Sequence, residues 1–441
     1  MEGPTSRRPL LRALLVLAFV STPAWAQKRA QDPKEVTGVV QEERRRSDPG
    51  RDAINVLLFV PRSTVELLFT ATGAAAVVVE EEQVVPRVED MLHPPAGEIR
   101  AFPTLFVETG SSFNVGARAL ARADHYAATV RGGVGGAHDF VAESRVGLSL
   151  PKPLPFALSL ESLHDERSAI GYLGLGQDPA TDPRNRFTGE ARGAVYRERR
   201  GRYIVSAGTR VHPDVELLLS TSFTRRHVLD PPDSTDTLER VFVPGSVPGT
   251  GSETHFLYQE AALRLDTRKT RGGPSTGVLL EGYAGHADGV DDTDAAFARV
   301  GGRAGAFVSV VEKSNVLSPR LSLDGLAPID GAVPFNELPR QPDFRGFDNR
   351  RDYVSAVASL DYRWTVMRYL AARLLVDAAT VAPQLSELAP EDARFAAGFG
   401  FDVFSRSTQL GSLAFIGSSD GFRFTFSFGV SSGFGDRQHR S

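Results

Sequence analysis

Residues 422–430, FRFTFSFGV, alternate between apolar and polar side chains, and this alternation decides how the rest of the chain is interpreted. Successive side chains of a β-strand point to opposite faces, so Phe422, Phe424, Phe426 and Phe428 share one face, with Arg, Thr and Ser on the other. The stretch therefore predicts a strand with one apolar face. A soluble sandwich also buries one face of each strand, so this stretch alone leaves a sandwich and a membrane barrel both open.

The same pattern recurs upstream as far as residue 101, in segments about as long as tilted membrane-spanning strands. We predict sixteen strands, an even number, as bacterial outer-membrane barrels formed by a single chain have. The predicted segments are 102–116, 122–134, 138–149, 154–164, 186–198, 202–212, 214–226, 254–268, 275–286, 294–312, 316–326, 351–366, 369–381, 391–403, 407–418 and 420–434.

The predicted connections differ in length, as the two ends of an outer-membrane barrel do. Short turns are expected at 135–137, 201, 212–213 and 419, and long polar loops at 165–185, 227–253 and 327–350. No second apolar face is present to pack against the first. We therefore favour an all-β, sixteen-stranded antiparallel transmembrane β-barrel over a soluble sandwich or propeller. A sheet of this size encloses a lumen that its own side chains cannot fill.

The N-terminal part divides by composition. Residues 1–26 combine basic residues, a short apolar run and the cleavage pattern Ala24-Trp25-Ala26, which predicts a secretory signal peptide. Residues 27–51 are expected to be a flexible leader, and 52–100 a short periplasmic helical segment that either packs against the barrel or lies at the membrane surface or in the pore. The barrel is assigned to 101–435 and a C-terminal tail to 436–441. After the signal peptide, no run of 18 apolar residues follows.

Composition disfavours several other classes of protein. The net charge of -4 does not favour nucleic acid, and the absence of cysteine removes thiol chemistry. The nine histidines are scattered without metal-ligand spacing, so we expect no metal, no cofactor and no enzyme activity. Residues 291–294 (DDTD) could bind a cation or form a solvated loop, without the EF-hand pattern. The glycines of residues 132–136 are attributed to a strand and its turn rather than to a phosphate site.

Residues 334–381 contain the strongest candidate site. Arg345 lies between Phe344 and Gly346 in a long predicted loop, and Asp377 is a lone acid in an apolar strand. Alternation puts Asp377 on the predicted lumen face, where a carboxylate needs a partner and a guanidinium can bind it through two hydrogen bonds. Either Arg345 and Asp377 form a latch that holds the loop inside the barrel, or they are unrelated surface charges.

These residues also carry a family resemblance. PFNELP at 334–339, FRGF at 344–347, DYR at 361–363 and the following Asp377 resemble the C-terminal barrel of the BamA/TamA family, the bacterial surface antigen superfamily. GYLGLG at 171–176 and LDTR at 265–268 are similar too. The resemblance implies that the loop of Arg345, Gly346 and Phe347 enters the barrel and that its arginine pairs with Asp377. Phe422, Phe424, Phe426, Phe428 and Phe434 match the C-terminal assembly signal of such barrels.

The resemblance further implies a protein of the outer membrane that assists insertion or translocation of protein, or of lipid. Expected partners are outer-membrane lipids, the barrel assembly machinery for its own insertion, and protein clients. Residues 27–100 lack the pattern of a POTRA domain, so we expect a POTRA-less barrel. Glycines 110, 116, 429, 433 and 435 predict a weak seam between 102–116 and 420–434. The alternative is a passive or gated pore, or a structural barrel.

Overall fold

The computed structural model describes residues 95–107, 113–135, 139–150, 155–190, 193–231, 234–268, 275–310, 315–339, 344–346, 350–404 and 409–428. The chain divides into two compact units, residues 1–84 and 85–441, and all described residues belong to the second. The predicted signal peptide, the leader, most of the helical segment at 52–100 and the tail at 436–441 lie outside the described residues. None of the described helices is long and apolar enough to cross a membrane.

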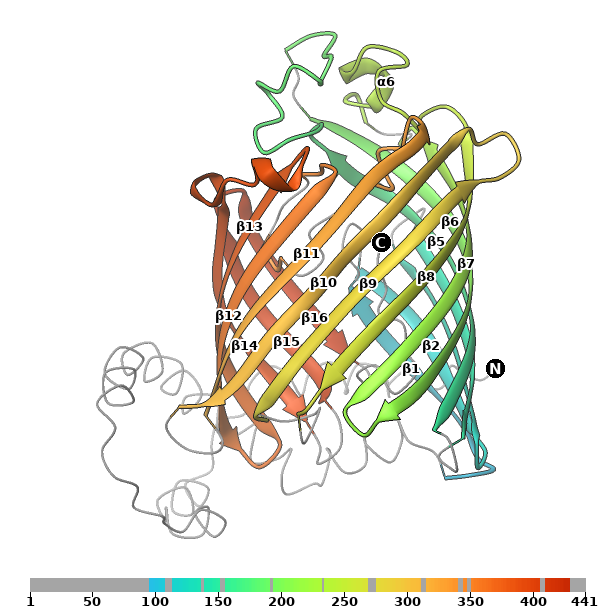
Figure 1. Ribbon diagram of the computed structural model, residues 1–441, viewed down its shortest axis with the longest axis vertical. Helices are drawn as coiled ribbons and strands as arrows, with labels where there is room; N and C mark the ends of the chain where they lie inside the picture. The colour runs from blue at the N-terminus through green and yellow to red at the C-terminus, as the bar shows by residue number, and fades with distance from the viewer. Residues whose placement is uncertain are drawn as a thin grey trace, which may run out of the picture. The chain divides into compact units, whose positions relative to one another are not determined.

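The described residues form one sheet of sixteen antiparallel strands in sequence order (Figure 1). The sheet curls until Cα atoms of the first and last strands lie within 8 Å of each other. Helical structure within the described residues is limited to α6 (Leu238–Val241), η2 (Leu385–Glu387) and η3 (Pro390–Asp392). The strands are β1 (Ile99–Val107), β2 (Phe113–Arg122), β3 (Tyr126–Gly135), β4 (Asp139–Leu150), β5 (Phe156–Tyr172), β6 (Ala194–His212), β7 (Val215–Leu229), β8 (Glu253–Asp266), β9 (Gly277–Gly289), β10 (Ala295–Ser309), β11 (Val316–Gly331), β12 (Val354–Met367), β13 (Leu370–Ala382), β14 (Arg394–Phe404), β15 (Gln409–Ser418) and β16 (Gly421–Phe428).

The predicted number of sixteen strands is confirmed. Two errors in the predicted boundaries cancel each other in this number. The predicted first strand, 102–116, is wrong because it spans two strands, β1 and β2, which pair antiparallel from Val107↔Phe113 outward. Apolar alternation continues on both sides of the reversal and hid it. β1 also begins at Ile99, so the predicted boundary between helical segment and barrel at 100/101 is two residues late.

The second error is the opposite of the first, because here one strand was predicted as two. The predicted strands 186–198 and 202–212 are wrong, since β6 is one strand and residues 186–193 precede it. Gly201, predicted as a turn, lies inside β6 and is paired with His164 on β5 and with Arg225 on β7. A single glycine does not reverse a strand when backbone hydrogen bonds on both sides hold it extended. The turn predicted at 419 does lie between strands, and that predicted at 212–213 is one residue early, because His212 ends β6 and residues 213–214 form the connection.

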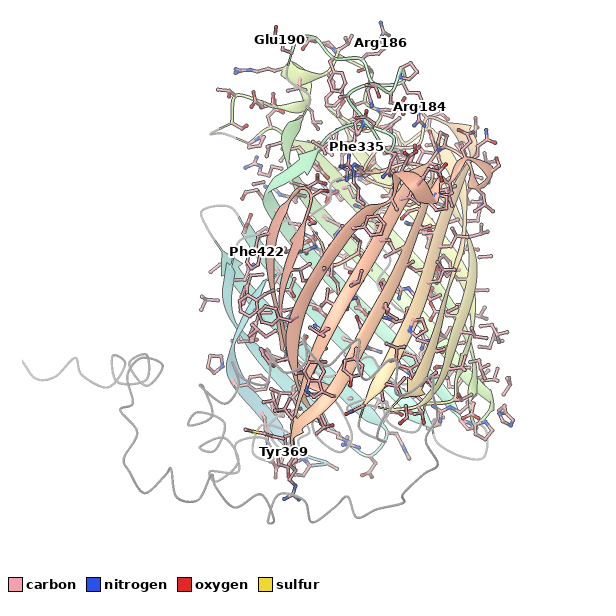
Figure 2. All side chains as sticks on the ribbon, turned by 90° about the vertical axis from the view of Figure 1, so that its left-hand side faces the viewer. Arg184, Arg186, Glu190, Phe335, Tyr369 and Phe422 are labelled. Atoms are coloured by element: carbon pink, nitrogen blue, oxygen red, sulfur yellow. The ribbon has the colours of Figure 1, made fainter. Side chains whose placement is uncertain are left out.

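The long connections gather at one end of the sheet, which we call the loop end. They are residues 173–193, 230–252 and 332–353, because β5, β7 and β11 run further than the predicted loops at 165–185, 227–253 and 327–350 allowed. Figure 2 shows Arg184 and Phe335 at the loop end and Tyr369, in the short β12–β13 turn, at the opposite end. The prediction of unequal ends is therefore confirmed, with corrected boundaries.

The faces of the sheet have opposite character. Buried positions on the concave side carry charge, for example Glu198, Arg200 and Arg202 on β6, while Tyr203 and Val205 on the convex side are 51% and 42% exposed. A soluble protein places its charges outward and its apolar side chains inward. The inverted arrangement fits a sheet whose convex side faces lipid and whose concave side lines a polar lumen.

One close approach depends on glycine. Gly116 of β2 lies opposite Gly133 of β3, and a Cβ at Gly116 would lie 1.9 Å from the carbonyl oxygen of Gly132. Gly116 therefore permits close packing between β2 and β3. It was predicted to weaken the first strand, but it lies on the second, and the predicted seam glycines 110, 429, 433 and 435 lie outside the described residues.

Replacing Val300 by arginine tests the orientation of the convex face. Val300 is central on β10 and 58% exposed, whereas its neighbour Arg299 is buried and paired with Asp324. If the convex face contacts lipid, Val300→Arg lowers the free energy of unfolding in lipid vesicles by about 2–4 kcal/mol. On a water-facing surface the change stays within about 0.5 kcal/mol. Urea unfolding of the variant and of a Val300→Leu control decides between them.

Candidate functional site

The loop between β11 and β12, residues 332–353, places an arginine against two acids of the concave wall. Arg345 donates from Nε to Asp377 Oδ2 at 2.8 Å and from Nη2 to Asp377 Oδ1 at 2.5 Å, and its backbone N–H donates to Oδ2 at 3.0 Å. Its Nη1 lies 2.6 Å from Asp361 Oδ1. One guanidinium therefore binds a carboxylate on β13 and another on β12.

The wall positions of these acids follow from strand alternation. Asp377 is 0% exposed and lies between buried Leu375 and Ala379, whereas Val376 on the opposite face is 47% exposed. Asp361 on β12 pairs in register with Leu375 and so lies one step along the same face. The structure thus brings Arg345 and Asp377 together. Asp361 was not assigned a role from the sequence, although its alternation phase on the preceding strand was a usable signal.

Burial and ionic partners act in opposite directions on Arg345. Burial alone would lower its pKa, but hydrogen bonds from Arg345 to Asp377 and the charge of Asp361 outweigh it and raise the pKa above its ordinary value. The guanidinium therefore stays charged, as an arginine does in proteins.

Neighbours of Arg345 fit closely against the same wall. Phe344 is 4% exposed and packs in a cluster that contains Ala396 of β14 and Ile416 of β15. A Cβ on Gly346 would lie 2.7 Å from Cβ of Ala396 and from the Phe344 ring, so the space admits only glycine without a shift. Phe347, the remaining predicted residue of this loop, lies outside the described residues.

The first part of the loop contacts strands far from β12 and β13 in the sheet order. Asn336 Nδ2 donates to Glu198 Oε1 on β6 at 3.1 Å, and Glu337 Oε1 lies 2.7 Å from Arg226 Nε on β7. Arg226 Nη1 also donates to Glu198 Oε1 at 3.0 Å. The loop therefore reaches both the β6–β7 wall and the β12–β13 wall, and so crosses the concave side.

Arg351 links the two ends of the loop. Its Nη1 donates to the carbonyl oxygen of Phe335 at 3.2 Å, and its Nη2 donates to the Tyr196 hydroxyl at 2.6 Å. The guanidinium carbon also lies 5.3 Å from the Phe335 ring centroid and 5.6 Å from those of Tyr172 and Tyr196. Cation–π attraction is strongest where the cation is desolvated, as Arg351 is at 2% exposure.

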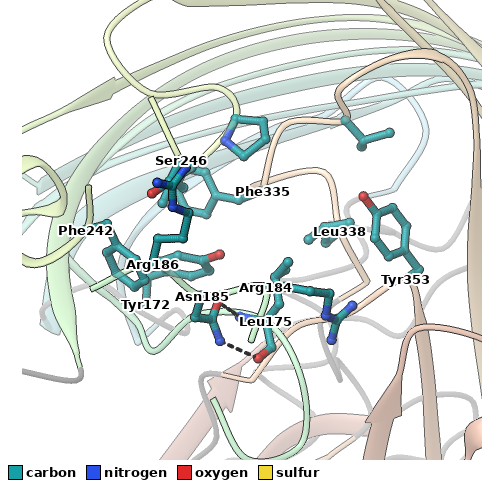
Figure 3. Close-up of a pocket in the computed structure, with 13 residues that line it drawn as sticks. Tyr172, Leu175, Arg184, Asn185, Arg186, Phe242, Ser246, Phe335, Leu338 and Tyr353 are labelled. Atoms are coloured by element: carbon teal, nitrogen blue, oxygen red, sulfur yellow. Dashed lines mark hydrogen bonds between the residues drawn. The ribbon is translucent and has the colours of Figure 1, made fainter. Parts of the chain in front are cut away.

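The three long loops meet over a small cavity at the loop end (Figure 3). Its volume is about 40 Å³, enough for a few water molecules but far below the several hundred Å³ of a small-molecule site. The lining residues are Tyr172, Leu175, Arg184, Asn185, Arg186, Phe242, Ser246, Val247, Pro248, Val333, Phe335, Leu338 and Tyr353. The cavity thus belongs to a packed cap and does not form an organic ligand site.

Ion pairs fasten the cap. Arg184 donates from Nη1 and Nη2 to Asp352 at 2.9 and 2.7 Å, and from Nη2 to Asp182 Oδ2 at 2.6 Å. Hydrogen bonds to Asp182 and Asp352 raise the pKa of Arg184 above its ordinary value. Burial of Asp182 would raise its pKa, but hydrogen bonds from Arg184 outweigh it and hold the pKa below its usual range. The 173–193 loop is therefore joined to residues 350–353 by charge.

Phe422, Phe424 and Phe426 of β16 share the convex face, as alternation predicts. Phe422 is 68% exposed and Phe424 is 46% exposed, and Phe426 is half-buried on the same face. Phe428 ends β16, and its side chain and Phe434 lie outside what the structure describes. Their role as an assembly signal stays a prediction.

The other candidates form no site in the described part of the chain. Asp291 accepts an ionic contact of 2.8 Å from His255 Nδ1, and its backbone φ is +56°. Within the described residues, no group of three or more histidine, aspartate or glutamate side chains is placed to hold a metal ion.

Comparison with known proteins shows the fold. The chain is similar to the crystal structure of BamA from Haemophilus ducreyi lacking POTRA domains 1–3, with a TM-score of 0.52 and 11% identity, over 75% of this chain and 68% of that one. Lower similarity exists to CdiB from Acinetobacter baumannii (TM-score 0.44, 9% identity, 74% and 58% covered). The translocator domain of autotransporter NalP from Neisseria meningitidis also matches (TM-score 0.24, 9% identity, 80% and 94% covered). No protein-family model and no curated protein matches.

The fold is therefore that of an outer-membrane β-barrel of the BamA type, an assignment that rests on the BamA similarity and on the sixteen-strand sheet. In a barrel of this type the concave side of the curled sheet faces the lumen, and the loop end is the end that carries the β11–β12 loop.

Replacing Arg345 tests how strongly the loop is held. Arg345→Ala leaves Asp377, which is 0% exposed, without its guanidinium and is expected to lower the free energy of unfolding by about 3–5 kcal/mol. Denaturant unfolding in detergent measures the change. Arg345→Lys, which keeps the charge but not the fork of donors, is expected to fall between Arg345→Ala and the parent.

A double variant provides the control. Arg345→Leu combined with Asp377→Leu removes both buried charges and is expected to be less destabilised than Arg345→Ala alone. A loss below about 1 kcal/mol for Arg345→Ala, as for an exposed ion pair, would contradict the buried pairing.

Proposed function

We propose that this chain is an outer-membrane barrel that assists the insertion or translocation of protein, or of lipid, at the bacterial outer membrane. Its partners would be outer-membrane lipids, protein clients, and the barrel assembly machinery that inserts the chain itself. The proposal requires no chemical step and no cofactor. The BamA-type fold, the inverted faces of the sheet and the resemblance of residues 334–377 to the BamA/TamA family support it.

The seam between β1 and β16 is the observation that carries the proposal. Among the described residues, hydrogen-bonded ladders join every strand to the next from β1 to β16, and no ladder joins β16 to β1. Cα atoms of these two strands nevertheless lie within 8 Å of each other. The described residues of β1 and β16 are thus close, without a hydrogen-bonded ladder from one strand to the other in the sheet order.

An unpaired strand edge presents backbone donors and acceptors that can template another strand. Binding by strand addition draws its affinity from backbone hydrogen bonds and so accepts many sequences. A barrel with such edges facing each other can admit a client strand between them and release it sideways into lipid. This is the route that the proposed function assigns to the β1–β16 seam.

A gated pore is the second candidate function. The loop between β11 and β12 favours it, because this loop crosses the lumen and is held at both walls. In that function the loop would close the lumen and the seam would stay shut.

A disulfide across the seam separates the two functions. The chain contains no cysteine, so one cysteine in β1 and one in β16, scanned over neighbouring positions until oxidation joins them, form a unique crosslink. If the seam admits clients, the oxidised protein loses insertion activity in a reconstituted vesicle assay and regains it after reduction. Each single-cysteine variant under the same oxidant is the control.

The opposite result would support the pore. In that case insertion activity is absent or unaffected by oxidation, conductance of planar bilayers survives the crosslink, and Arg345→Ala increases it. Full insertion activity with a quantitatively formed crosslink would overturn the seam mechanism.

A further inference from the structure

Two side chains at the start of the last strand contact the inserted loop. Arg423 of β16 donates from Nη1 to the carbonyl oxygen of Gly346 at 3.2 Å. Asp420, in the turn just before β16, accepts from Nη1 and Nη2 of Arg350 at 3.0 Å each. The loop between β11 and β12 is therefore attached to the edge strand of the seam at two places.

The attachment of Arg423 continues a row of contacts along the wall. Residues 344–346 contact Asp361 on β12, Asp377 on β13 and Ala396 on β14, and Phe344 packs in the cluster that contains Ile416 on β15. Arg423 adds β16 to this row. Three loop residues thus bridge the five C-terminal strands, ending at the seam.

The second attachment joins the edge strand to the cap. Besides Asp420, Arg350 binds the carbonyl oxygen of Gln177 through Nε at 3.0 Å, and the backbone N–H of Val381 on β13 donates to Gln177 Oε1 at 3.0 Å. The Arg350 side chain is 5% exposed and the Asp420 side chain is 29% exposed, so the contact is partly shielded from water on the arginine side. Charge-assisted hydrogen bonds in such surroundings are among the stronger ones.

Both contacts lie at the same end of β16. β16 runs from Gly421 at the loop end to Phe428, so Asp420 and Arg423 hold the loop-end part of the strand. Arg423 lies on the polar, lumen-facing side between Phe422 and Phe424, which point outward. A loop held inside the lumen therefore holds the loop end of β16 against β15 and the wall.

We propose that Arg423 and Asp420 are positioning residues that couple the inserted loop to the seam. When residues 344–346 and Arg350 stay on the wall, the loop end of β16 is fixed, and when they leave it, this part of β16 is released for opening against β1. The proposal rests on the proposed function, because it assigns a control to the same seam. It needs no client to be tested.

Hydrogen exchange of the purified full chain in detergent, read strand by strand by mass spectrometry, tests the coupling. Arg423→Gln is expected to speed exchange of β16 amides about tenfold, the factor that corresponds to about 1.4 kcal/mol, while β5–β8 keep their rates. Arg345→Gln, which frees the loop at β12 and β13 without touching β16, is expected to speed β16 exchange as well. Arg423→Lys, which retains a donor for Gly346, is expected to recover most of the parent rate.

Combining the variants distinguishes coupling from independent damage. In the Arg423→Gln, Asp420→Asn background, Arg345→Gln is expected to add nothing further at β16, because the attachments that transmit its effect are gone. Arg100→Gln removes an arginine from the other edge strand, where it pairs with Glu98, and serves as the matched control. It should leave β16 exchange unchanged.

Three results would overturn the proposal. They are unchanged β16 exchange in Arg345→Gln, equal acceleration in β5–β8, and fully additive effects of the loop and β16 variants. Where Arg345→Gln does not fold, Asp377→Asn weakens the same contact from the β13 side, without touching β16, and gives the same readout. Coupled exchange together with a seam disulfide that leaves insertion intact would reject the proposed function while the coupling stands. Uncoupled exchange with a disulfide-sensitive activity would reject the coupling alone.

Discussion

The contact between Arg345 and Asp377 is the constraint on which the arrangement inside the barrel depends. A carboxylate with 0% exposure needs a cation with matching geometry, and a loop that enters a lumen needs a reason to stay there. The guanidinium of Arg345 compensates the buried charge of Asp377, and the carboxylate of Asp377 holds the loop. Two side-chain hydrogen bonds and one backbone hydrogen bond from Arg345 converge on this acid. Phe344 and Gly346 pack against β14 and β15 on either side of the residue that this contact fixes.

The cations that bind the buried acids on the concave side are arginines, not lysines, in the part of the chain that the structure describes. The chain has 45 arginines and five lysines, and all five lysines lie outside the described residues. A guanidinium has five donors in a planar fork, so one side chain can serve an acid and a carbonyl oxygen together. Arg350 does this with Asp420 and the carbonyl oxygen of Gln177, whereas Arg345 serves two acids, Asp361 and Asp377. On the strands themselves, Arg264 bridges Glu216 and Glu281 on the neighbouring strands in the same way.

The sequence predicted those features that depend on local periodicity. Alternation around Phe422 and Asp377 identified the correct faces, because the two-residue period of a strand acts on each residue separately. Boundaries failed where tertiary pairing overrides a local signal. Gly201 resembles a turn in isolation, but its neighbours on β5 and β7 hold it extended, and the reversal after Val107 was hidden by continuing alternation.

Contacts between residues far apart in the sequence could not be predicted, for a similar reason. The contacts of Asn336 with Glu198 and of Arg423 with Gly346 join residues 138 and 77 positions apart, and no period in the chain encodes such pairs. They become visible only once strand order places β6 and β16 around one lumen. Arg345 and Asp377 were predictable because one acid stood out in an apolar strand. Asp361, followed by Tyr362 and Arg363 in the sequence, did not stand out.

A loop inside a barrel must also satisfy its own backbone, and here arginine side chains accomplish this. Buried carbonyl groups without partners are costly, which is why connections normally run over a surface. The carbonyl oxygens of Phe335 and Gly346 accept from Arg351 and Arg423, so groups that water would otherwise bind are bound by cations. These arginines come from the loop itself and from β16, the last strand. The carbonyl oxygen of Gly346 therefore keeps this partner only while β16 stays in place, and this dependence links the loop on the concave side to the edge of the sheet.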